Sequence, residues 1–372
     1  MTSRVTRLQL SEFRNYETLD LPTDAQLVAL SGDNGAGKTN LLEAVSFLCA
    51  GRGLRRADLK DISRRNSCRP WAVSATLNGA TGDAQLGTGI DLSEPGRKCR
   101  IDRAPVSSAL AFADHLRLIW LTPAQDGLFT GSAGDRRRFL DRLVLAVDTA
   151  HGARVSALER ALRSRNKLLE EQSFDSGWAS SIEREIAEIG TSVAAARSET
   201  AARLQALIAR QRNDFSPFPY ADIALEGELE KRVMQEPASS VEDWFREELR
   251  KTRARDRASG RTLTGPQMSD LIVLHGPKQA LAAQSSTGEQ KALLIGLILA
   301  HGQLVNEMTG IAPILLLDEI AAHLDPKRRA ALYELLRDLG GQVFMTGTDP
   351  SLFEMLGTDS LQLFVDGGVI SS

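Results

Sequence analysis

The amino-acid sequence predicts an α/β fold in which a mostly helical lobe is inserted into a lobe built from both chain ends. A short apolar run at 27–30 precedes a glycine-rich turn and a segment with helical spacing, which is typical of a buried strand, a turn and a helix. A second apolar run at 314–317 indicates another buried strand near the opposite chain end. Between these runs, apolar residues recur with helical spacing from about 135 to 213.

The remaining elements follow from local patterns. Short apolar or alternating runs bounded by turn residues predict strands at 5–10, 18–21, 71–77, 89–92, 98–101, 116–121, 223–225, 270–274, 342–345, 361–365 and 368–370. The turns Asn78-Gly79 and Thr81-Gly82 favour an antiparallel meander in the first third of the chain. Further helices are expected at 38–50, 241–255, 290–302 and 326–339. We place the first lobe at 1–122 and 271–372, and the inserted lobe at 123–270.

Composition narrows the class of protein. No apolar run approaches the roughly 20 residues of a transmembrane helix, and the N-terminus lacks the apolar core of a signal peptide. We therefore expect a cytoplasmic protein without a membrane partner. The three cysteines and five histidines are scattered, so neither a disulfide framework nor a zinc site is expected. Arginines cluster at 52–56, 64–65, 97–103, 136–138 and 250–261, which fits either DNA binding or a solvated surface.

The turn after the first buried strand is a full P-loop match, with glycine, four residues, glycine, lysine and threonine. Its glycines allow positive φ angles and close approach of a phosphate, and its N–H groups can form an anion-binding nest. Lys38 supplies a positive charge for the outer phosphates, and the Thr39 hydroxyl is a ligand for Mg²⁺. The predicted nucleotide-binding residues here are Gly32, Asp33, Asn34, Gly35, Ala36, Gly37, Lys38, Thr39 and Asn40.

Two acids follow the strand at 314–317, which is the Walker B pattern. A carboxylate at the carboxyl end of a strand lies where ligands bind in an α/β sheet. We expect Asp318 to hold Mg²⁺ together with Thr39, and Glu319 to orient or deprotonate the attacking water. A strand can end in acids by chance, but this one follows an intact P-loop in the same chain.

Two further turns have both a functional and a structural interpretation. Ser286-Thr287-Gly288-Glu289 opens an apolar helix, so it is either a phosphate-binding turn or an ordinary capping box. Asp325-Pro326, within 321–326, fits a helix N-terminus and also the D-loop that follows Walker B in ABC-type ATPases. The order of the motifs favours the functional interpretation of both turns.

This order resembles that of ABC-type ATPases. The segment 8–16, which contains Phe13-Arg14-Asn15-Tyr16, and the segment 32–44 are similar to those of the RecF family, bacterial ATPases of recombinational repair. Matches at 135–141, 165–169 and 260–266 extend the similarity over essentially the whole chain. The fold class implied is an ABC-type P-loop ATPase head with an antiparallel β subdomain and an inserted helical lobe.

The resemblance implies a weak, DNA-stimulated ATPase that uses ATP and Mg²⁺ as a switch. It implies an ATP-dependent homodimer in which Ser286 and Gly288 of one copy cap the nucleotide on the P-loop of the other. It also implies binding to single-stranded DNA and to gapped or junction duplexes, with RecR and RecO helping to load RecA, and roles in replication and the SOS response. Arg14, Asn15 and Asp325 are expected to contact nucleotide, and Gln125 is the Q-loop candidate for the metal.

The chain departs from the family pattern at two places. Gln267-Met268-Ser269 stand where many members have His-Arg-Asp, and no switch histidine follows the strand at 342–345, where Thr346 or Thr348 is the candidate γ-phosphate sensor. Two other functions are considered. One is the ATP-binding subunit of an ABC transporter, against which the Phe-Arg-Asn-Tyr start, the arginine-rich insertion and the missing histidine argue. The other is a structural DNA clamp that binds ATP without useful turnover.

Overall fold

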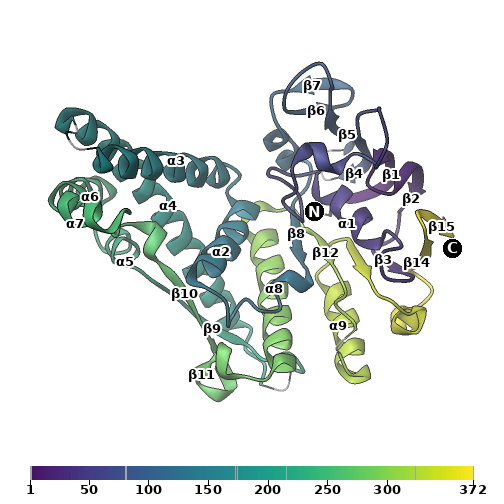
Figure 1. Ribbon diagram of the computed structural model, residues 1–372. Coiled ribbons are helices and arrows are strands. Elements are labelled where there is room, and N and C mark those ends of the chain that lie inside the picture. The colour runs from purple at the N-terminus through teal and green to yellow at the C-terminus, as the bar shows by residue number, and fades with distance from the viewer. Residues whose placement is uncertain are drawn as a thin grey trace. The chain divides into compact units, whose positions relative to one another are not determined.

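The computed structural model describes residues 2–79, 82–171, 173, 175–214, 216–322 and 324–371. The chain forms two compact units. The first lobe comprises Met1–Asp126, Phe215–Pro219 and Ser286–Ser372, and the inserted lobe comprises Gly127–Asp214 and Tyr220–Ser285. Figure 1 labels the elements of both lobes along the chain.

The boundary after the inserted lobe lies at 285 instead of the predicted 270. The reason is strand pairing: β10 (Asp270–His275) lies between β9 (Ala221–Glu226) and β11 (Ala280–Leu281) in a three-stranded antiparallel sheet. The partner strand β9 lies far from β10 in the chain, so a local pattern does not assign β10 to its lobe. The segment 123–126, predicted to belong to the inserted lobe, lies in the first lobe.

A six-stranded sheet of the first lobe carries the predicted motifs. Its order is β15-β14-β3-β13-β12-β8, and all neighbouring pairs are parallel except β14 with β15. The strands are β3 (Leu27–Ser31), β8 (Leu118–Leu121), β12 (Ile314–Leu317), β13 (Val343–Thr346), β14 (Leu361–Asp366) and β15 (Val369–Ser371). All residues of β3, β8, β12 and β13 are buried, as expected for a parallel sheet covered on both faces. Because β13 lies between β3 and β12, their carboxyl ends meet at one edge.

The second sheet of this lobe is antiparallel, in the order β2-β1-β4-β5-β6-β7. Its strands are β1 (Arg4–Phe13), β2 (Tyr16–Pro22), β4 (Ala72–Gly79), β5 (Gly82–Ile90), β6 (Arg97–Ile101) and β7 (Ala104–Val106). The predicted meander is present, but β5 starts earlier than the predicted 89–92, because its glycines and polar residues obscure the alternation. The predicted turn at Thr81 lies outside the described residues. Phe13, Phe47 and Trp71 pack together with ring centroids 5.2–6.1 Å apart.

Three α-helices belong to the first lobe: α1 (Lys38–Ser46), α8 (Thr287–Thr309) and α9 (Pro326–Asp338). Helix α1 ends before the predicted 50, and Phe47 turns into the aromatic cluster instead. Among the described helices, α8 alone has the length and apolarity to cross a membrane, and 56% of that stretch is buried inside the fold. Short 3₁₀ turns occupy Leu59–Ile62, Ala109–Asp114, Pro123–Gln125, Pro266–Met268, Gly276–Lys278, Ala282–Gln284 and Pro350–Leu356.

The inserted lobe is mostly helical, as predicted. Its helices are α2 (Ala133–Val147), α3 (His151–Glu170), α4 (Ser176–Arg210), α5 (Glu228–Val233), α6 (Ala238–Lys251) and α7 (Arg253–Ser259). The predicted helix at 241–255 is divided at Thr252, whose hydroxyl contacts Asp256. Apolar faces of α3, α4 and α6 meet around the fully buried Ile186 and Phe245.

Buried ion pairs also hold the inserted lobe together. Asp141 on α2 accepts two hydrogen bonds from Arg197 at 2.7 and 2.8 Å and lies 2.8 Å from His151 Nε2. Burial works to raise the pKa of Asp141, but the hydrogen bonds from His151 and Arg197 lower it below its usual value. The Asp141 carboxylate is therefore stabilised in its charged form.

Candidate nucleotide-binding site

The P-loop joins β3 to α1 and depends on glycine at both ends. Gly32 has φ 142° and Gly37 has φ 123°, a region that favours glycine. A Cβ on Gly32 would lie 2.1 Å from the backbone oxygen of Val365, and one on Gly37 would lie 2.4 Å from Asn15 Nδ2. Sterics and dihedral angles therefore both require glycine, because the loop lies against the C-terminal strand and the N-terminal segment.

Lys38 lies inside this loop and is almost fully buried. Its ammonium group donates to the carbonyl oxygens of Gly32 and Asp33 at 2.5 and 2.8 Å. Burial lowers the pKa of Lys38, and the negative charges of Glu319 and Asp318 act in the opposite direction. The lysine is thus held in the curve of the loop, where a phosphate would replace the carbonyls as its partner. The predicted residues at the tip, 33–35, are exposed.

The Walker B acids meet the P-loop through two hydroxyl groups. Thr39 Oγ1 donates to the Asp318 carboxylate, with distances of 2.9 and 3.2 Å to its two oxygens. Thr346, at the end of β13, donates to Asp318 Oδ1 at 2.7 Å and accepts the backbone N–H of Glu319 at 2.9 Å. Thr346 therefore positions both acids, although its predicted role was to sense the γ-phosphate. Thr348, the other candidate, is exposed.

The Thr39–Asp318 pair fits a magnesium site. A hydroxyl and a carboxylate lie within hydrogen-bond distance at the start of α1, and such hard oxygen ligands suit Mg²⁺. Glu319 has φ 51°, an uncommon conformation for a residue with a side chain, and it is half-buried. Its backbone is held by Thr346, and within the described residues its carboxylate has no hydrogen-bond or ion-pair partner. That carboxylate is therefore available to a water molecule.

The Arg14-Asn15-Tyr16 segment braces the P-loop rather than extending into it. Arg14 makes a bidentate ion pair with the fully buried Glu43 of α1, at 2.7 and 2.8 Å. Asn15 Nδ2 donates to the backbone oxygen of Ala36 at 3.0 Å, and Tyr16 donates to that of Gly37 at 3.1 Å. These contacts position the P-loop and helix α1, and the direct nucleotide contacts of Arg14 and Asn15 stay a prediction. Asn15 Oδ1 in turn accepts a hydrogen bond of 2.7 Å from Asn40.

Gln125 occupies the predicted place next to the Walker B strand, but its oxygen is already bonded. The backbone N–H of Asp318 donates to the backbone oxygen of Leu121 at 2.9 Å, so the loop after β8 starts beside the acids. In that loop, Gln125 Oε1 accepts the backbone N–H of Thr122 at 3.0 Å in a capping box. This hydrogen bond occupies one lone pair of the oxygen, and the metal contact of Gln125 stays a prediction. Gln125 Nε2 is buried without a partner in the described structure.

The turn at 286–289, which we call the signature turn, forms the N-terminus of α8, and its residues 286–288 are exposed. Ser286 Oγ accepts the backbone N–H of Glu289 at 3.4 Å, and Glu289 reaches back to the backbone N–H of Ser286 at 3.1 Å. The structural interpretation of this turn, a capping box, is thus present. A Cβ on Gly288 would have no neighbour within 4 Å, so the turn leaves open space for another molecule. Asp325 caps α9 through the backbone N–H of Arg328, and His323 lies outside the described residues.

Comparisons with known proteins agree with these motifs. The family model described as the RecF/RecN/SMC N terminal domain matches residues 4–369. The DNA replication and repair protein RecF of Brucella abortus (strain 2308) is 54% identical over 369 residues, covering 99% of this chain and 96% of the relative. That of Rhizobium meliloti (strain 1021) is 52% identical over 369 residues, covering 99% and 98%. The chain belongs to the RecF family.

Solved structures show the same fold for this RecF-family chain. A structure of the recombination mediator protein RecF-ATPrS in the RecFOR pathway matches with a TM-score of 0.86 and 20% identity, covering 99% of this chain and 98% of the other. A structure of an SMC head bound to the C-winged helix domain of ScpA matches with a TM-score of 0.55 and 14% identity, covering 99% and 96%. The fold is an ABC-type P-loop ATPase head with an antiparallel β subdomain and an inserted, mostly helical lobe.

Sequence reasoning missed one support of the P-loop in this RecF-family chain. The backbone N–H of Gly368 donates to the backbone oxygen of Ala36 at 3.1 Å, so the C-terminal hairpin holds the loop opposite Asn15. Gly368 has φ 90°, and a Cβ there would lie 3.0 Å from the Asn15 backbone oxygen. The adjacent glycines at 367 and 368 are the only local signal of this contact.

Several arginines of the predicted basic clusters are structural. Arg97 donates to the backbone oxygens of Cys49 and Phe47, and Arg136 forms a bidentate pair with Asp270 at 2.7 Å. Arg253 pairs with Glu183. In the described part of the first lobe, exposed arginines without an ion pair to a carboxylate are Arg56, Arg65, Arg69, Arg100 and Arg103. The clusters therefore divide into structural and surface arginines, which their sequence positions alone do not separate.

Proposed function

We propose that this protein is an ATP-dependent DNA-binding protein of recombinational gap repair, whose ATP hydrolysis is slow and serves as a switch. The observation that carries the proposal is the continuous chain of contacts from the P-loop to the Walker B acids. Thr39 and Thr346 both bond Asp318, Thr346 holds the backbone of Glu319, and Lys38 lies in the loop itself. These five residues have the chemistry that phosphoryl transfer to water requires.

Each residue has a defined task in this proposal. Bound Mg²⁺ would supply charge neutralisation on the β- and γ-phosphates, and Thr39 and Asp318 would hold it. Lys38 exchanges its two loop carbonyls for phosphate oxygens. Glu319, held in its unusual backbone conformation, orients the attacking water and accepts its proton. The braced glycine loop keeps its N–H groups directed at the phosphates.

We propose further that ATP closes a homodimer. Ser286 and Gly288 are exposed at the N-terminus of α8, with open space around Gly288. In the capping box the Ser286 hydroxyl donates to the Glu289 carboxylate at 3.0 Å, and we propose that it exchanges this partner for the γ-phosphate bound to a second copy, because a helix N-terminus favours anions. Asp325 lies at the N-terminus of α9 and is the D-loop candidate in the same interface. Hydrolysis then separates the copies.

We propose that the protein binds DNA and acts in DNA repair. Relatives that are more than half identical are named DNA replication and repair proteins, and a protein of the same fold is named a recombination mediator in the RecFOR pathway. We therefore infer that the protein is cytoplasmic, binds single-stranded DNA and gapped or junction duplexes, and acts with RecR and RecO to load RecA. We propose a role in replication from the names of these relatives and a role in the SOS response from the family resemblance alone. The five exposed arginines without a carboxylate partner in the described part of the first lobe are the first candidates for contacts with the phosphate backbone.

The test is binding to gapped DNA as a function of salt, with and without ATP, for wild type and Glu319→Gln. We expect affinity to rise with ATP and to fall steeply with salt, because phosphate contacts release counterions. Glu319→Gln should bind ATP normally and remain on the DNA as a dimer after wild type has dissociated. A Glu319→Gln dimer with the wild-type lifetime would refute the assigned role of Glu319. Salt-independent binding, or no binding to gapped DNA with ATP, would refute the proposed function.

A further inference from the structure

A cavity of about 370 Å³ lies within the inserted lobe, and none of its lining residues belongs to the motifs of the nucleotide site. It is lined by residues of α2, of α3 and of the segment 261–268. Its apolar surface comes from Ala133, Leu162 and Met268, and two guanidinium groups, of Arg137 and Arg261, flank it. The volume lies in the range of sites that bind small ligands or single side chains, about 300–1,000 Å³.

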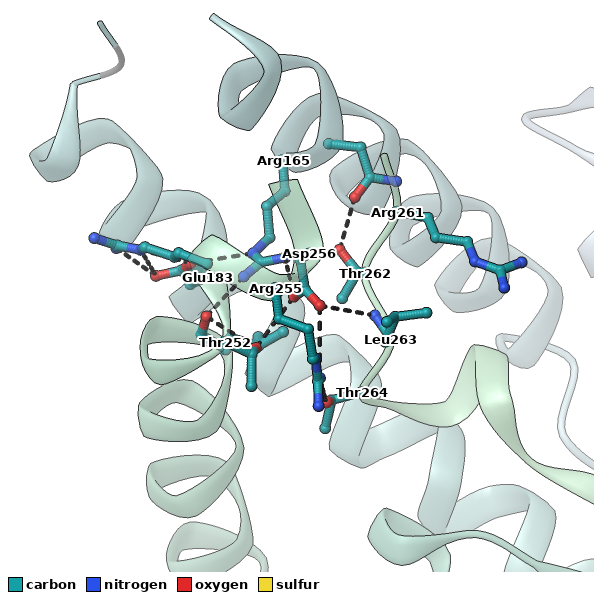
Figure 2. A network of polar contacts seen from close by, with 12 residues as sticks. Arg165, Glu183, Thr252, Arg255, Asp256, Arg261, Thr262, Leu263 and Thr264 are labelled. Carbon is teal, nitrogen blue, oxygen red and sulfur yellow. Dashed lines mark hydrogen bonds and ion pairs between the residues drawn. The ribbon is translucent and has the colours of Figure 1, made fainter. Parts of the chain in front are cut away.

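Neither guanidinium group has a carboxylate partner among the described residues. Arg137 donates to the backbone oxygen of Ser269 at 2.5 Å. The adjacent arginines on the helix form ion pairs with acids nearby, Arg136 with Asp270 and Arg138 with Asp135. Figure 2 shows the guanidinium of Arg261 directed away from the polar network, with no dashed line reaching it. Asp270 and Asp141 offset part of the Arg137 charge, whereas no described carboxylate pairs with Arg261, so the cavity carries a net positive charge at Arg261 that attracts an anion.

The wall that carries Arg261 is rigid. Thr262, the next residue, donates to Asn166 Oδ1 at 2.7 Å and accepts from Arg165 at 2.8 Å. Arg165 is fully buried and pairs with Asp256 at 2.8 Å, while the backbone N–H of Arg261 bonds the Asp256 backbone oxygen at 3.1 Å. Figure 2 shows how this network, drawn from α3, α4 and α7, fixes the segment that begins at Arg261. The site is preorganised, so binding costs little ordering of its wall.

We propose that this cavity binds an acidic peptide segment of a partner protein. An apolar side chain of the peptide rests against Leu162 and Met268, and its carboxylates pair with Arg137 and Arg261. Guanidinium groups bind carboxylates in a bidentate geometry, and a flexible methionine that is 50% exposed adapts to varied apolar side chains. Single-stranded DNA is disfavoured here because no lining residue is aromatic, so its bases would have no stacking surface. This partner site goes beyond the proposed ATPase function and does not depend on it.

The test uses the full-length protein and a short fluorescein-labelled peptide of alternating Asp and Leu, measured by fluorescence anisotropy. Arg261→Glu should weaken binding at least about tenfold, because it replaces an attraction by a repulsion. The matched control is Arg160→Glu, an exposed arginine on α3 two positions from Leu162 and therefore on a different face of the helix. That control should change binding less than about twofold, and both variants should keep the wild-type melting temperature.

Two further measurements locate the peptide. The ¹³C-methyl NMR signal of Met268 should shift when the peptide is added, and a peptide with Ser in place of Leu should bind more weakly. Met268→Glu should abolish the binding in the same way as Arg261→Glu, which covers the case that one variant fails to fold. Equal losses in Arg160→Glu and Arg261→Glu, or an unshifted Met268 signal, would overturn the proposal. So would a Met268 shift caused by a labelled oligothymidine but not by the peptide.

Discussion

Replacing Thr346 by valine removes one hydroxyl group from the centre of the candidate site while keeping its shape. Thr346 is fully buried, donates to Asp318 at 2.7 Å and accepts from the Glu319 backbone at 2.9 Å. A hydrogen bond to a charged group is worth about 1.5–3 kcal/mol, and a buried N–H left unpaired costs about 1–3 kcal/mol. We take about 3 kcal/mol as the combined cost of losing both hydrogen bonds, because partial relaxation of the site reduces the sum of the two values.

This loss should appear in turnover more than in nucleotide affinity. Lys38 and the loop remain, so the Kd for ATP should change less than about threefold, whereas misplacement of the acids worth 1.4 kcal/mol or more lowers kcat at least about tenfold. Steady-state phosphate release gives kcat, and titration with a fluorescent ATP analogue gives Kd. Thr346→Ser, which keeps the hydroxyl, should recover most of kcat. Wild-type kcat in Thr346→Val, or equal losses in both variants, would refute the positioning role.

Three further predictions concern stability. Arg14→Ala removes the bidentate partner of the buried Glu43 carboxylate and should lower the unfolding free energy by about 1.5–3 kcal/mol, because Arg55 still pairs with Glu43 at 3.0 Å. Arg7→Ala, which breaks an exposed pair, should change it little in the same urea titrations. Gly32→Ala forces a Cβ to within 2.1 Å of a β14 carbonyl oxygen and should lower the melting temperature and abolish ATP binding by calorimetry. The lowered pKa of Asp141 stabilises the folded protein at pH values above about 3.9, the pKa of this side chain in the unfolded state. This stabilisation is lost as the pH falls through the lower pKa of the folded state. The stability gap between wild type and Asp141→Asn should therefore shrink from pH 5 to pH 2.

Each of these predictions has a result that would contradict it. Equal destabilisation by Arg14→Ala and Arg7→Ala would show that burial of the Glu43 pair is unimportant. Wild-type ATP affinity in Gly32→Ala would show that the loop does not need its contact with β14. A stability gap for Asp141→Asn that stays constant with pH would mean that the native-state pKa of this carboxylate is not lowered.

Local patterns predicted the elements that carry the chemistry. The Walker B strand has the predicted bounds, 314–317, because an apolar run ended by two acids is a strong local signal. The P-loop needed only its own residues to be recognised, and its strand and helix flank it as expected. The helical insertion followed from its spacing, although the ends of its helices did not.

Contacts between distant residues were beyond a local pattern. The bidentate pair of Arg14 with Glu43 joins the end of β1 to α1, and only the fold of these two elements shows it. Thr346 reaches Asp318 because β13 pairs with β12. The residues of one strand do not determine which strands lie beside it in the sheet. The fully buried Arg165 joins α3, α4 and α7 through acids up to 91 positions away, and a buried arginine contradicts the expectation that arginine is exposed.

The central claim is that a complete nucleotide site needs the P-loop of one copy and the signature turn of another. Mixing Lys38→Ala with Ser286→Ala tests it most directly, because each variant alone should lack hydrolysis and ATP-dependent dimerisation. In a mixed dimer, one of the two sites would pair an intact Lys38 with an intact Ser286. We predict that mixing restores up to about half of the wild-type ATPase rate per dimer. No recovery at any mixing ratio, with both variants folded, would contradict a site shared between two copies.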